Sequence, residues 1–186
     1  MGFLSNLLHL GKSSNSDTAS SVVANAEPIN ADITLYAPVN GTLLPLEEVP
    51  DIVVSERVLG EGVAVAPESE TIVAPCDGVI SRILPTKNGF AVKMAQGLEV
   101  YVGFGIESME MKGEGFTLKV NVGDEVKRGD PVIITDQRLL GKKLKSTITS
   151  MVAIRSTSNI DKVINASGKC MAGYTPVVWI NLKQPA

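Results

Sequence analysis

The chain is poor in aromatic residues and almost without histidine. Aromatic residues make up 4% of its 186 residues, and the single histidine, His9, lies in the N-terminal tail, where we assign it no role. Hydrophobic residues account for 44% and charged residues for 20%, a ratio typical of a soluble protein with a packed core. Because aromatic residues are scarce, we expect this core to consist mainly of Val, Ile, Leu and Ala.

Strong net charge and long apolar runs are also missing. The formal net charge is −3, and no basic run is longer than the doublet Lys142-Lys143, so we expect no nucleic-acid partner. No apolar run approaches the roughly 20 residues that a membrane-spanning helix needs. The N-terminus lacks the basic start, the long apolar stretch and the small-residue cleavage site of a secretory signal. These absences predict a cytoplasmic protein.

Cysteine is limited to two residues. Cys76 and Cys170 stand far apart and belong to no C-x-x-C motif. Their spacing does not decide whether they form a disulfide. Because nothing in the sequence indicates export, we expect the protein to be in a reducing compartment. Cys76 falls on a turn-like A-P-x-D-G sequence, where it is predicted to pack as a small buried apolar residue.

The first 32 residues differ from the rest of the chain. In residues 1–12, four apolar side chains share one face at helical spacing: Phe3, Leu4, Leu7 and Leu8. A helix this short is marginal in water and needs a surface, either a partner protein or the membrane interface. With Lys12 as its only lysine it lacks a cationic face, so any membrane association is expected to be weak. A frayed tail is the equal alternative. Residues 13–32, rich in Ser, Ala and Asn, are predicted to form a flexible linker.

Residues 33–186 have the composition of a single all-β domain. Short segments rich in Val and Ile are separated by Gly, Pro, Asn and Asp, which is typical of a β-sandwich or barrel. The expected strand segments are ITLYAPVNG, EGVAVAP, TIVAPCDGVISRI, GFAVKM, LEVYVGFGI, DPVIITD and YTPVVWINL. Only residues 136–145 and 159–164 are predicted as helices, and both are short.

A weak internal repeat supports a sandwich of two similar halves. The segments APVNGTLLPL and APCDGVISRI share the pattern A-P-x-x-G followed by apolar residues. Proline restricts the backbone before a turn and glycine permits positive φ within it, so each segment predicts a strand, a turn and a second strand.

Several longer motifs resemble a known family. They are APVNGTLLPLEEVPDIVVSERVLGEGVAVAP, IVAPCDGVISRI, VGFGIESMEMKGEGF, VGDEVKRGDPVI and KSTIT. Along nearly the whole globular zone the chain resembles the glucose-type IIA component of the bacterial phosphoenolpyruvate–sugar phosphotransferase system. The resemblance implies one β-sandwich of two similar hairpin motifs, of the duplicated hybrid motif type, with a few short helices.

The resemblance also locates a site, and the site is altered. In the family, a histidine immediately before an FGI motif receives a phosphoryl group from the histidine phosphocarrier protein and passes it to a cysteine of a sugar-permease IIB domain. A second histidine, two residues after a threonine, supports the first. The matching positions here are Gly103 and Asn88, the latter two residues after Thr86.

These replacements predict a protein that carries no phosphate. Phosphoryl transfer through histidine needs an imidazole lone pair, which neither glycine nor an amide supplies. None of the possible substitute acceptors is expected to serve: Cys76 is expected to be buried, Asp51 and Glu107 lack a magnesium-binding cluster, and Thr86 lacks a base. The zinc site that the family's histidine pair can form is lost with the histidines, so we expect no metal and no cofactor.

The surroundings of the site are predicted to bind proteins. Family members contact partners through an apolar ring edged by acidic residues. The corresponding residues are Ile52, Val53, Val54, Val58, Leu59, Leu84, Tyr101, Phe104, Glu107, Met109 and Glu110. Expected partners are sugar permeases, enzymes of sugar metabolism or components of the phosphotransferase system. The sequence thus favours a regulatory binding module.

Three alternatives remain open. The chain could be a phosphocarrier with a non-histidine acceptor, or a folded paralogue without function. A third alternative follows from VNVGDEVKRGDPV and the V-K-M sequence around Lys93, which resemble fragments of biotinyl and lipoyl carrier domains. Such carriers place the modified lysine at a hairpin tip, whereas Lys93 lies in a strand-like segment.

Overall fold

The fold was analysed in a computed structural model that describes residues 30–154, 156 and 159–183. The predicted amphipathic segment 1–12, the linker up to residue 29 and His9 lie outside these residues. The strands are β1 Ile33–Tyr36, β2 Gly41–Leu44, β3 Gly60–Pro67, β4 Thr71–Val73, β5 Gly78–Ile83, β6 Gly89–Lys93, β7 Glu99–Ile106, β8 Phe116–Leu118, β9 Glu125–Val126, β10 Pro131–Thr135, β11 Ser146–Ile154, β12 Ile160–Asn165, β13 Gly168–Cys170 and β14 Pro176–Leu182. The helical elements are η1 Leu46–Glu48, α1 Ile52–Ser55, η2 Ser108–Met111 and α2 Gln137–Lys143.

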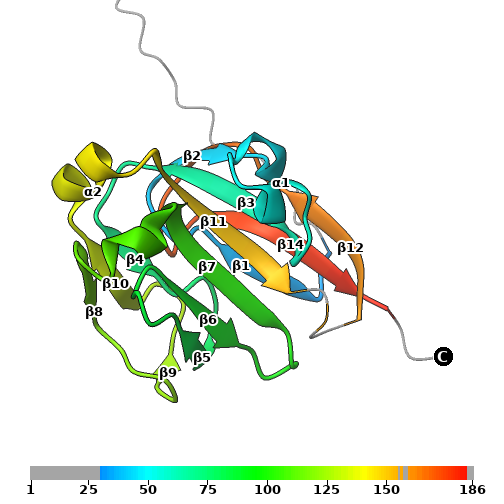
Figure 1. The fold of residues 1–186 in the computed structure, drawn as a ribbon. Coiled ribbons are helices and arrows are strands. Elements are labelled where there is room, and N and C mark those ends of the chain that lie inside the picture. Colours follow the sequence, from blue (N-terminus) through cyan, green and yellow to red (C-terminus); the bar gives the residue numbers. More distant parts are fainter. Residues whose placement is uncertain (1–29, 155, 157–158, 184–186) are drawn as a thin grey trace, which may run out of the picture.

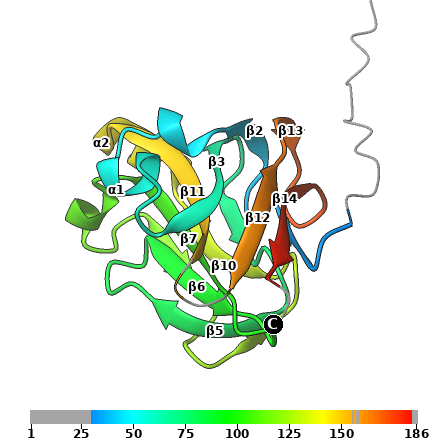
Figure 2. The same cartoon turned by 90° about the vertical axis from the view of Figure 1, so that its right-hand side faces the viewer.

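The strands form one large sheet and two small ones. The eight-stranded sheet has the order β13-β2-β3-β11-β7-β6-β5-β9, and the three-stranded sheets have the orders β1-β14-β12 and β4-β10-β8 (Figures 1 and 2). All paired strands are antiparallel. The predicted β-sandwich with a few short helices is therefore confirmed.

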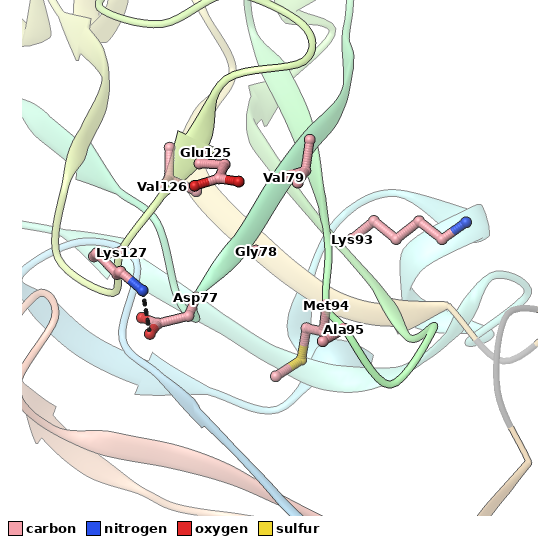
Figure 3. A pocket seen from close by; sticks show the side chains of 9 residues that line it. All are labelled: Asp77, Gly78, Val79, Lys93, Met94, Ala95, Glu125, Val126 and Lys127. Carbon is pink, nitrogen blue, oxygen red and sulfur yellow. Dashed lines mark hydrogen bonds and ion pairs between the residues drawn. The ribbon is translucent and has the colours of Figure 1, made fainter.

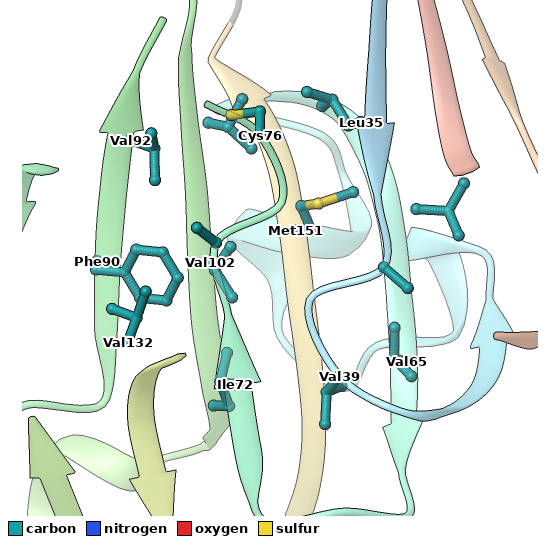
Figure 4. Close-up of a cluster of buried hydrophobic side chains, with 14 of the residues drawn as sticks. Leu35, Val39, Val65, Ile72, Cys76, Phe90, Val92, Val102, Val132 and Met151 are labelled. Atoms are coloured by element: carbon teal, nitrogen blue, oxygen red, sulfur yellow. The ribbon is translucent and has the colours of Figure 1, made fainter. Parts of the chain in front are cut away.

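The core lies between the large sheet and the two small sheets. Figure 4 shows side chains from all three sheets meeting there, among them Leu35, Ile72, Phe90, Val102 and Met151. Most members of this cluster are Val, Ile, Leu and Ala, as expected from the shortage of aromatic residues. Burial of this apolar surface is the main source of the stability of the fold.

The internal repeat has a structural counterpart. The Tyr36 N–H donates to the Pro75 carbonyl at 2.9 Å, and the Val73 N–H donates to the Pro38 carbonyl at 2.8 Å, so the two A-P-x-x-G segments exchange a reciprocal pair of hydrogen bonds. Gly41 and Gly78, the last residue of each motif, lie equally close to a neighbouring strand. A Cβ on Gly41 would lie 2.1 Å from Ala66 O, and one on Gly78 would lie 2.4 Å from Lys93 O.

The two halves differ in how they cover the outer face of the large sheet. In the first half, residues 45–59 connect β2 to β3, and Leu46 and Val49 of this connection pack against Val152 and Ala64. In the second half, the corresponding connection between β5 and β6 spans only residues 84–88. The outer face of β6 and β7 is therefore left without an equivalent cover.

Of the two predicted helices, one is confirmed and one is wrong. Residues 137–143 form α2, and its N-cap Asp136 accepts the Leu139 N–H at 2.9 Å. Residues 160–165 form β12 instead of a helix, with Val163 opposite Ile180 of β14. This segment is rich in β-branched residues and too short to be stable as a helix, so pairing with β14 determines its conformation.

Strand β11, in the middle of the large sheet, was not among the strands expected from the sequence. Strand β11 pairs with β3 on one side and with β7 on the other, in the middle of the large sheet. Its first residues, Ser146 and Thr147, are polar and follow directly on α2, which hid the strand pattern. Among the described residues, no helix is long and apolar enough to span a membrane.

Candidate functional site

The predicted site residues come from four separate segments. Asp51 and α1 supply Ile52, Val53 and Val54, followed by Val58 and Leu59. The β5–β6 connection supplies Leu84, Thr86 and Asn88, and β7 supplies Tyr101, Gly103 and Phe104. Glu107, Met109 and Glu110 belong to the turn around η2.

Most of these residues line one hollow of about 380 Å³ on the uncovered outer face of the sheet. The residues around it are Asp51, Val53, Val54, Leu59, Leu84, Asn88, Tyr101, Gly103, Phe104, Gly105, Ile106, Glu107, Ser108, Met109 and Ser150. The structure thus brings together segments that are more than 50 residues apart in the sequence. Four predicted residues, Ile52, Val58, Thr86 and Glu110, do not line the hollow. Ile52 and Val58 are 75% and 69% exposed.

The floor of the hollow includes two small residues of neighbouring strands, Gly103 and Ser150. Ala64 of β3 pairs with Ser150 of β11, Ser150 pairs with Gly103 of β7, and Gly103 pairs with Gly89 of β6. Paired residues of antiparallel strands lie on the same face, so Ser150 and Gly103 are neighbours in the hollow. The row continues on one side to Ala64, which is buried beneath residues 45–59, and on the other side to Gly89. Ser150 was missed by the sequence analysis because β11 had not been recognised.

Asn88 is held in a chain of hydrogen bonds at one side of this floor. Thr86 Oγ1 donates to Asn88 Oδ1 at 2.5 Å, Asn88 Nδ2 donates to Ser108 Oγ at 2.7 Å, and Ser108 Oγ donates to the Phe104 carbonyl at 2.5 Å. Asn88 and Ser108 are both buried. The amide therefore has a fixed orientation, and the Thr86 proton is already engaged. Ser108 was present in the GFGI-x-S motif, but no role had been assigned to it.

Phe104 lies in the core and offers no side chain to the surface. It is 1% exposed, and its ring packs edge-to-face on Phe116 with centroids 5.6 Å apart. Successive strand residues point to opposite faces, so Phe104 points inward where Gly103 points outward. Its assignment to the exposed apolar ring is corrected, although its backbone borders the hollow.

Tyr101 is half-buried and stands directly beside Gly103. A Cβ placed on Gly103 would lie 2.6 Å from Tyr101 Oη, so the tyrosine ring occupies the space above the glycine. Burial raises the pKa of the Tyr101 hydroxyl, the carboxylate of Asp51 adds to this effect, and Arg82 opposes it. A phenol with a raised pKa is a poor nucleophile at neutral pH.

The charged edge of the hollow contains an ion pair, and the segments around the hollow contain residues with positive φ. Glu107 Oε1 and Lys145 Nζ are 2.8 Å apart, and the hydrogen bond to Glu107 raises the pKa of Lys145. Four non-glycine residues in the described part of the chain have positive φ, namely Arg57, Lys87, Glu107 and Lys112. All four lie in the segments that carry the site, and strain of this kind often persists at functional surfaces.

Neither cysteine belongs to the site. Cys76 and Cys170 are free and buried, which confirms the expected packing of Cys76. Burial raises the pKa of Cys76 to about 12 and that of Cys170 to about 11, so both are thiols at neutral pH. In the described ranges, no three His, Cys, Asp or Glu side chains gather as a metal site would require.

A second hollow, of about 560 Å³, lies where β5, β6 and β9 meet (Figure 3). Asp77 Oδ2 and Lys127 Nζ are 3.4 Å apart at its edge, and the Lys93 side chain points away from this pair. Lys93 is the last residue of β6 and pairs with Glu99 of β7. It is therefore a strand residue, as expected, and not the tip of a hairpin, which lies at residues 94–98.

Comparison with known families decides the assignment. The model of the family described as "phosphoenolpyruvate-dependent sugar phosphotransferase system, EIIA 1" matches residues 33–159. The chain belongs to this family.

Members of the EIIA family resemble this chain in both sequence and fold. The glucose-specific EIIA component of Haemophilus influenzae is 42% identical over 149 residues, covering 80% of this chain and 89% of the relative. That of Halalkalibacterium halodurans is 37% identical over 153 residues, covering 80% and 86%. The solved glucose permease IIA of Mycoplasma capricolum superposes with a TM-score of 0.74 at 28% identity, covering 78% of this chain and 94% of that one.

In this EIIA-family chain, the described residues that line the hollow include no histidine. Gly103 and Asn88, expected from the sequence at the family's two histidine positions, both line the hollow, and Thr86 is hydrogen-bonded to Asn88. The chain's single histidine, His9, lies outside the described residues. The hollow offers an amide, two hydroxyls, a phenol and an apolar wall, which can form hydrogen bonds and contacts with a protein surface.

Proposed function

We propose that this EIIA-family chain carries no phosphate and acts as a regulatory, protein-binding module linked to sugar uptake in the cytoplasm. The observation that supports this proposal is that Gly103 and Asn88 stand where the resemblance places the acceptor histidine and its supporting histidine. Gly103 has no side chain, and the amide of Asn88 is tied to Thr86 and Ser108 by hydrogen bonds. Neither position supplies the lone pair that must attack phosphorus.

The docking surface consists of the apolar side chains around the hollow. Ile52, Val58 and Met109 are the most exposed of them, and Met109 is 64% exposed. Val53, Val54, Leu59, Leu84 and Tyr101 form the wall behind them, with Glu107 and Glu110 at the edge. Exposed apolar side chains gathered at one place favour protein binding.

The centre of the docking surface would stay uncharged at all times, and this would determine how partner binding is regulated. In a phosphorylated IIA protein, a dianionic group stands in the middle of the apolar surface and must be desolvated when a partner binds. At Gly103 no such group can form. Partners of unphosphorylated IIA proteins should therefore bind this chain whatever the sugar supply. Sugar permeases and enzymes of sugar metabolism are the partner classes we infer. The chain is also 35% identical to part of the N-acetylglucosamine-specific EIICBA component of Klebsiella pneumoniae, of which it covers 24%.

Intact-mass measurement tests the chemistry. The full chain is incubated with enzyme I, the histidine phosphocarrier protein and phosphoenolpyruvate, with the Haemophilus influenzae relative as the positive control. We expect no mass gain in this chain and one phosphate on the relative. A phosphate on this chain would show that it is a phosphocarrier with a different acceptor, and fragment masses would locate that residue.

Binding measurements test the docking surface. Candidate permeases and sugar kinases of the native cell are titrated with the chain, with and without the active phosphorylation system. We expect the same affinity in both conditions, and a loss of about tenfold or more for Ile52→Asp or Met109→Asp. Val122→Asp is the matched control, because Val122 is 60% exposed but lies outside the site. Affinity that follows the phosphorylation state, or no binding to any candidate, contradicts the proposal.

A further inference from the structure

Exposed apolar side chains of the domain are concentrated around the hollow. In the part of the chain that the structure describes, nine large apolar side chains are exposed, and five of them belong to the docking surface: Ile52, Val53, Val58, Leu59 and Met109. The other four are spread over other segments: Val79, Val122, Met171 and Tyr174. Exposed apolar side chains that gather in one place typically mark a surface that another polypeptide segment covers.

The sequence contains a segment that fits such a surface. Residues 1–12 place Phe3, Leu4, Leu7 and Leu8 on one face at helical spacing, and a helix this short is stable only against a surface. An amphipathic helix binds by laying its apolar anchors, three or four residues apart, into an apolar groove. The hollow, with its wall of apolar side chains, offers a groove of this kind.

The charges of the segment and of the docking surface favour the same contact. Residues 1–16 contain Lys12 and no acidic residue. The two segments that carry most of the docking surface, 45–59 and 107–112, contain six acidic residues against two basic ones: Glu47, Glu48, Asp51, Glu56, Glu107 and Glu110 against Arg57 and Lys112. A segment without carboxylates is attracted to an acidic edge, whereas binding to anionic lipid needs more positive charge than one lysine supplies.

The described part of the chain begins close to one end of the docking surface. The Leu182 N–H donates to Asp32 Oδ2 at 2.7 Å, at the end of β14. The next residue, Lys183, lines a hollow of about 480 Å³ together with Arg57, which directly precedes Val58. Strand β12, which also lines this hollow, lies between β14 and β3 (Figure 2). One hollow therefore separates the start of the described chain from the docking surface.

The linker is long enough to bridge this separation. A compact domain of about 150 residues has a radius of gyration of about 15 Å, so points on its surface are at most about 40 Å apart. As the flexible linker that the sequence predicts, residues 13–29 have a root-mean-square span of about 20–25 Å and reach about 55–60 Å when fully extended. A tether of this length holds its end at an effective concentration on the order of 1 mM.

We propose that residues 1–12 dock as a short amphipathic helix on the docking surface of the same chain and cover the hollow. The inference rests on the proposed function, because the surface that the segment covers is the one that binds partners. The segment competes with these partners, so the free chain exposes its docking surface for only part of the time. A partner has to displace the segment before it binds.

Paramagnetic broadening in NMR spectra locates the segment in the full chain. A nitroxide is attached to the variant Ser5→Cys; the two native cysteines are buried thiols and do not compete for the label. We expect loss of the methyl signals of Ile52 and Met109 and an unchanged signal of Val122, which is exposed outside the docking surface. In a mixture of nitroxide-labelled chain and isotope-labelled chain without nitroxide, all three signals should persist, because the docking is within one chain.

Competition by a peptide tests whether the segment occupies the surface. The probe is a fluorescent peptide of residues 1–12, and the full-chain variant Leu4→Asp/Leu8→Asp has no apolar face of its own to dock. We expect the peptide to bind this variant about tenfold more tightly than the wild type, whose tethered segment competes. Adding Met109→Asp to the variant should remove most of the binding, and adding Val122→Asp, the matched control, should leave it unchanged.

Four results would overturn the docking. They are retained Ile52 and Met109 signals in the nitroxide-labelled chain, loss of these signals in the mixture, which indicates a second copy, equal peptide affinities of the wild type and the variant, and peptide binding to phosphatidylglycerol vesicles but not to the variant. These measurements use neither a partner nor phosphate. Phosphate on the wild type would contradict the proposed function, and the nitroxide measurement would still decide the docking. Conversely, a segment that does not dock leaves the proposed function to the partner titrations.

Discussion

The amide of Asn88 donates to Ser108 Oγ at 2.7 Å, which joins the end of the β5–β6 connection to the turn at η2 beneath the site. Ser108 is 2% exposed, and its own proton goes to the Phe104 carbonyl. Both side chains are buried, so bulk solvent does not replace a lost partner, and the contact fixes the two segments relative to each other.

Removal of the Ser108 hydroxyl should destabilise the protein. Ser108→Ala leaves the buried Asn88 amide without its acceptor, at a cost of about 1–3 kcal/mol in the free energy of unfolding. Denaturant unfolding measures the change. Ser81→Ala serves as the control, because Ser81 is half-buried and its hydrogen bond to Ala91 is long, at 3.3 Å. Equal losses in the free energy of unfolding for the two substitutions would mean that the buried network stabilises the fold no more than an ordinary surface hydrogen bond does.

Asp51 should control the segment that presents the exposed apolar side chains. Its Oδ1 accepts the N–H groups of Val53 at 2.9 Å and Val54 at 3.2 Å, as the N-cap of α1. Asp51→Ala should lower the free energy of unfolding by about 1 kcal/mol and weaken partner binding, because α1 loses its only side-chain cap. Asp51→Asn, which retains a capping oxygen, should preserve most of both. If both variants lose binding equally, the Asp51 charge matters and the cap does not.

Cys76 should make stability fall at high pH. Burial raises the pKa of its thiol from 9.0 to about 12, so the folded protein keeps a proton that the unfolded chain releases. The contribution is fully present below pH 9 and is lost as the pH rises from about 9 to about 12, with a slope approaching 1.4 kcal/mol per pH unit. Unfolding curves of the wild type and Cys76→Ala over this range isolate the effect. Parallel pH profiles for the two proteins would contradict it.

The two glycines that end the A-P-x-x-G segments should resist substitution in the same way. A Cβ on Gly41 or Gly78 meets a backbone carbonyl of the paired strand at 2.1 or 2.4 Å, and a backbone atom has little freedom to move. Gly41→Ala and Gly78→Ala should each cost about 3 kcal/mol or more, or prevent folding. Thermal unfolding and expression yield measure this, and the control is Gly141→Ala in α2, where a Cβ meets nothing within 4 Å. Tolerance at one glycine but not at the other would show that the two halves are not equivalent.

The sequence determined the family, the β-rich fold class and the absence of imidazole at positions 88 and 103. These conclusions depend on local composition, on motif spacing and on the chemical identity of single residues. The helix at 137–143 could also be predicted, because its N-cap and its apolar residues are adjacent in the chain. None of these features requires knowledge of which distant segments meet.

The resemblance in sequence anticipated most of the site residues, but only the tertiary structure decided which side chains reach the hollow. Strand β11 brings Ser150 beside Gly103, and pairing with β14 turns an expected helix into β12. The alternation of β7 buries Phe104 and places Tyr101 over Gly103. Contacts of this kind depend on strand register and on which face a residue occupies. A single-residue shift reverses both, and the register is fixed only when the whole sheet packs against its core.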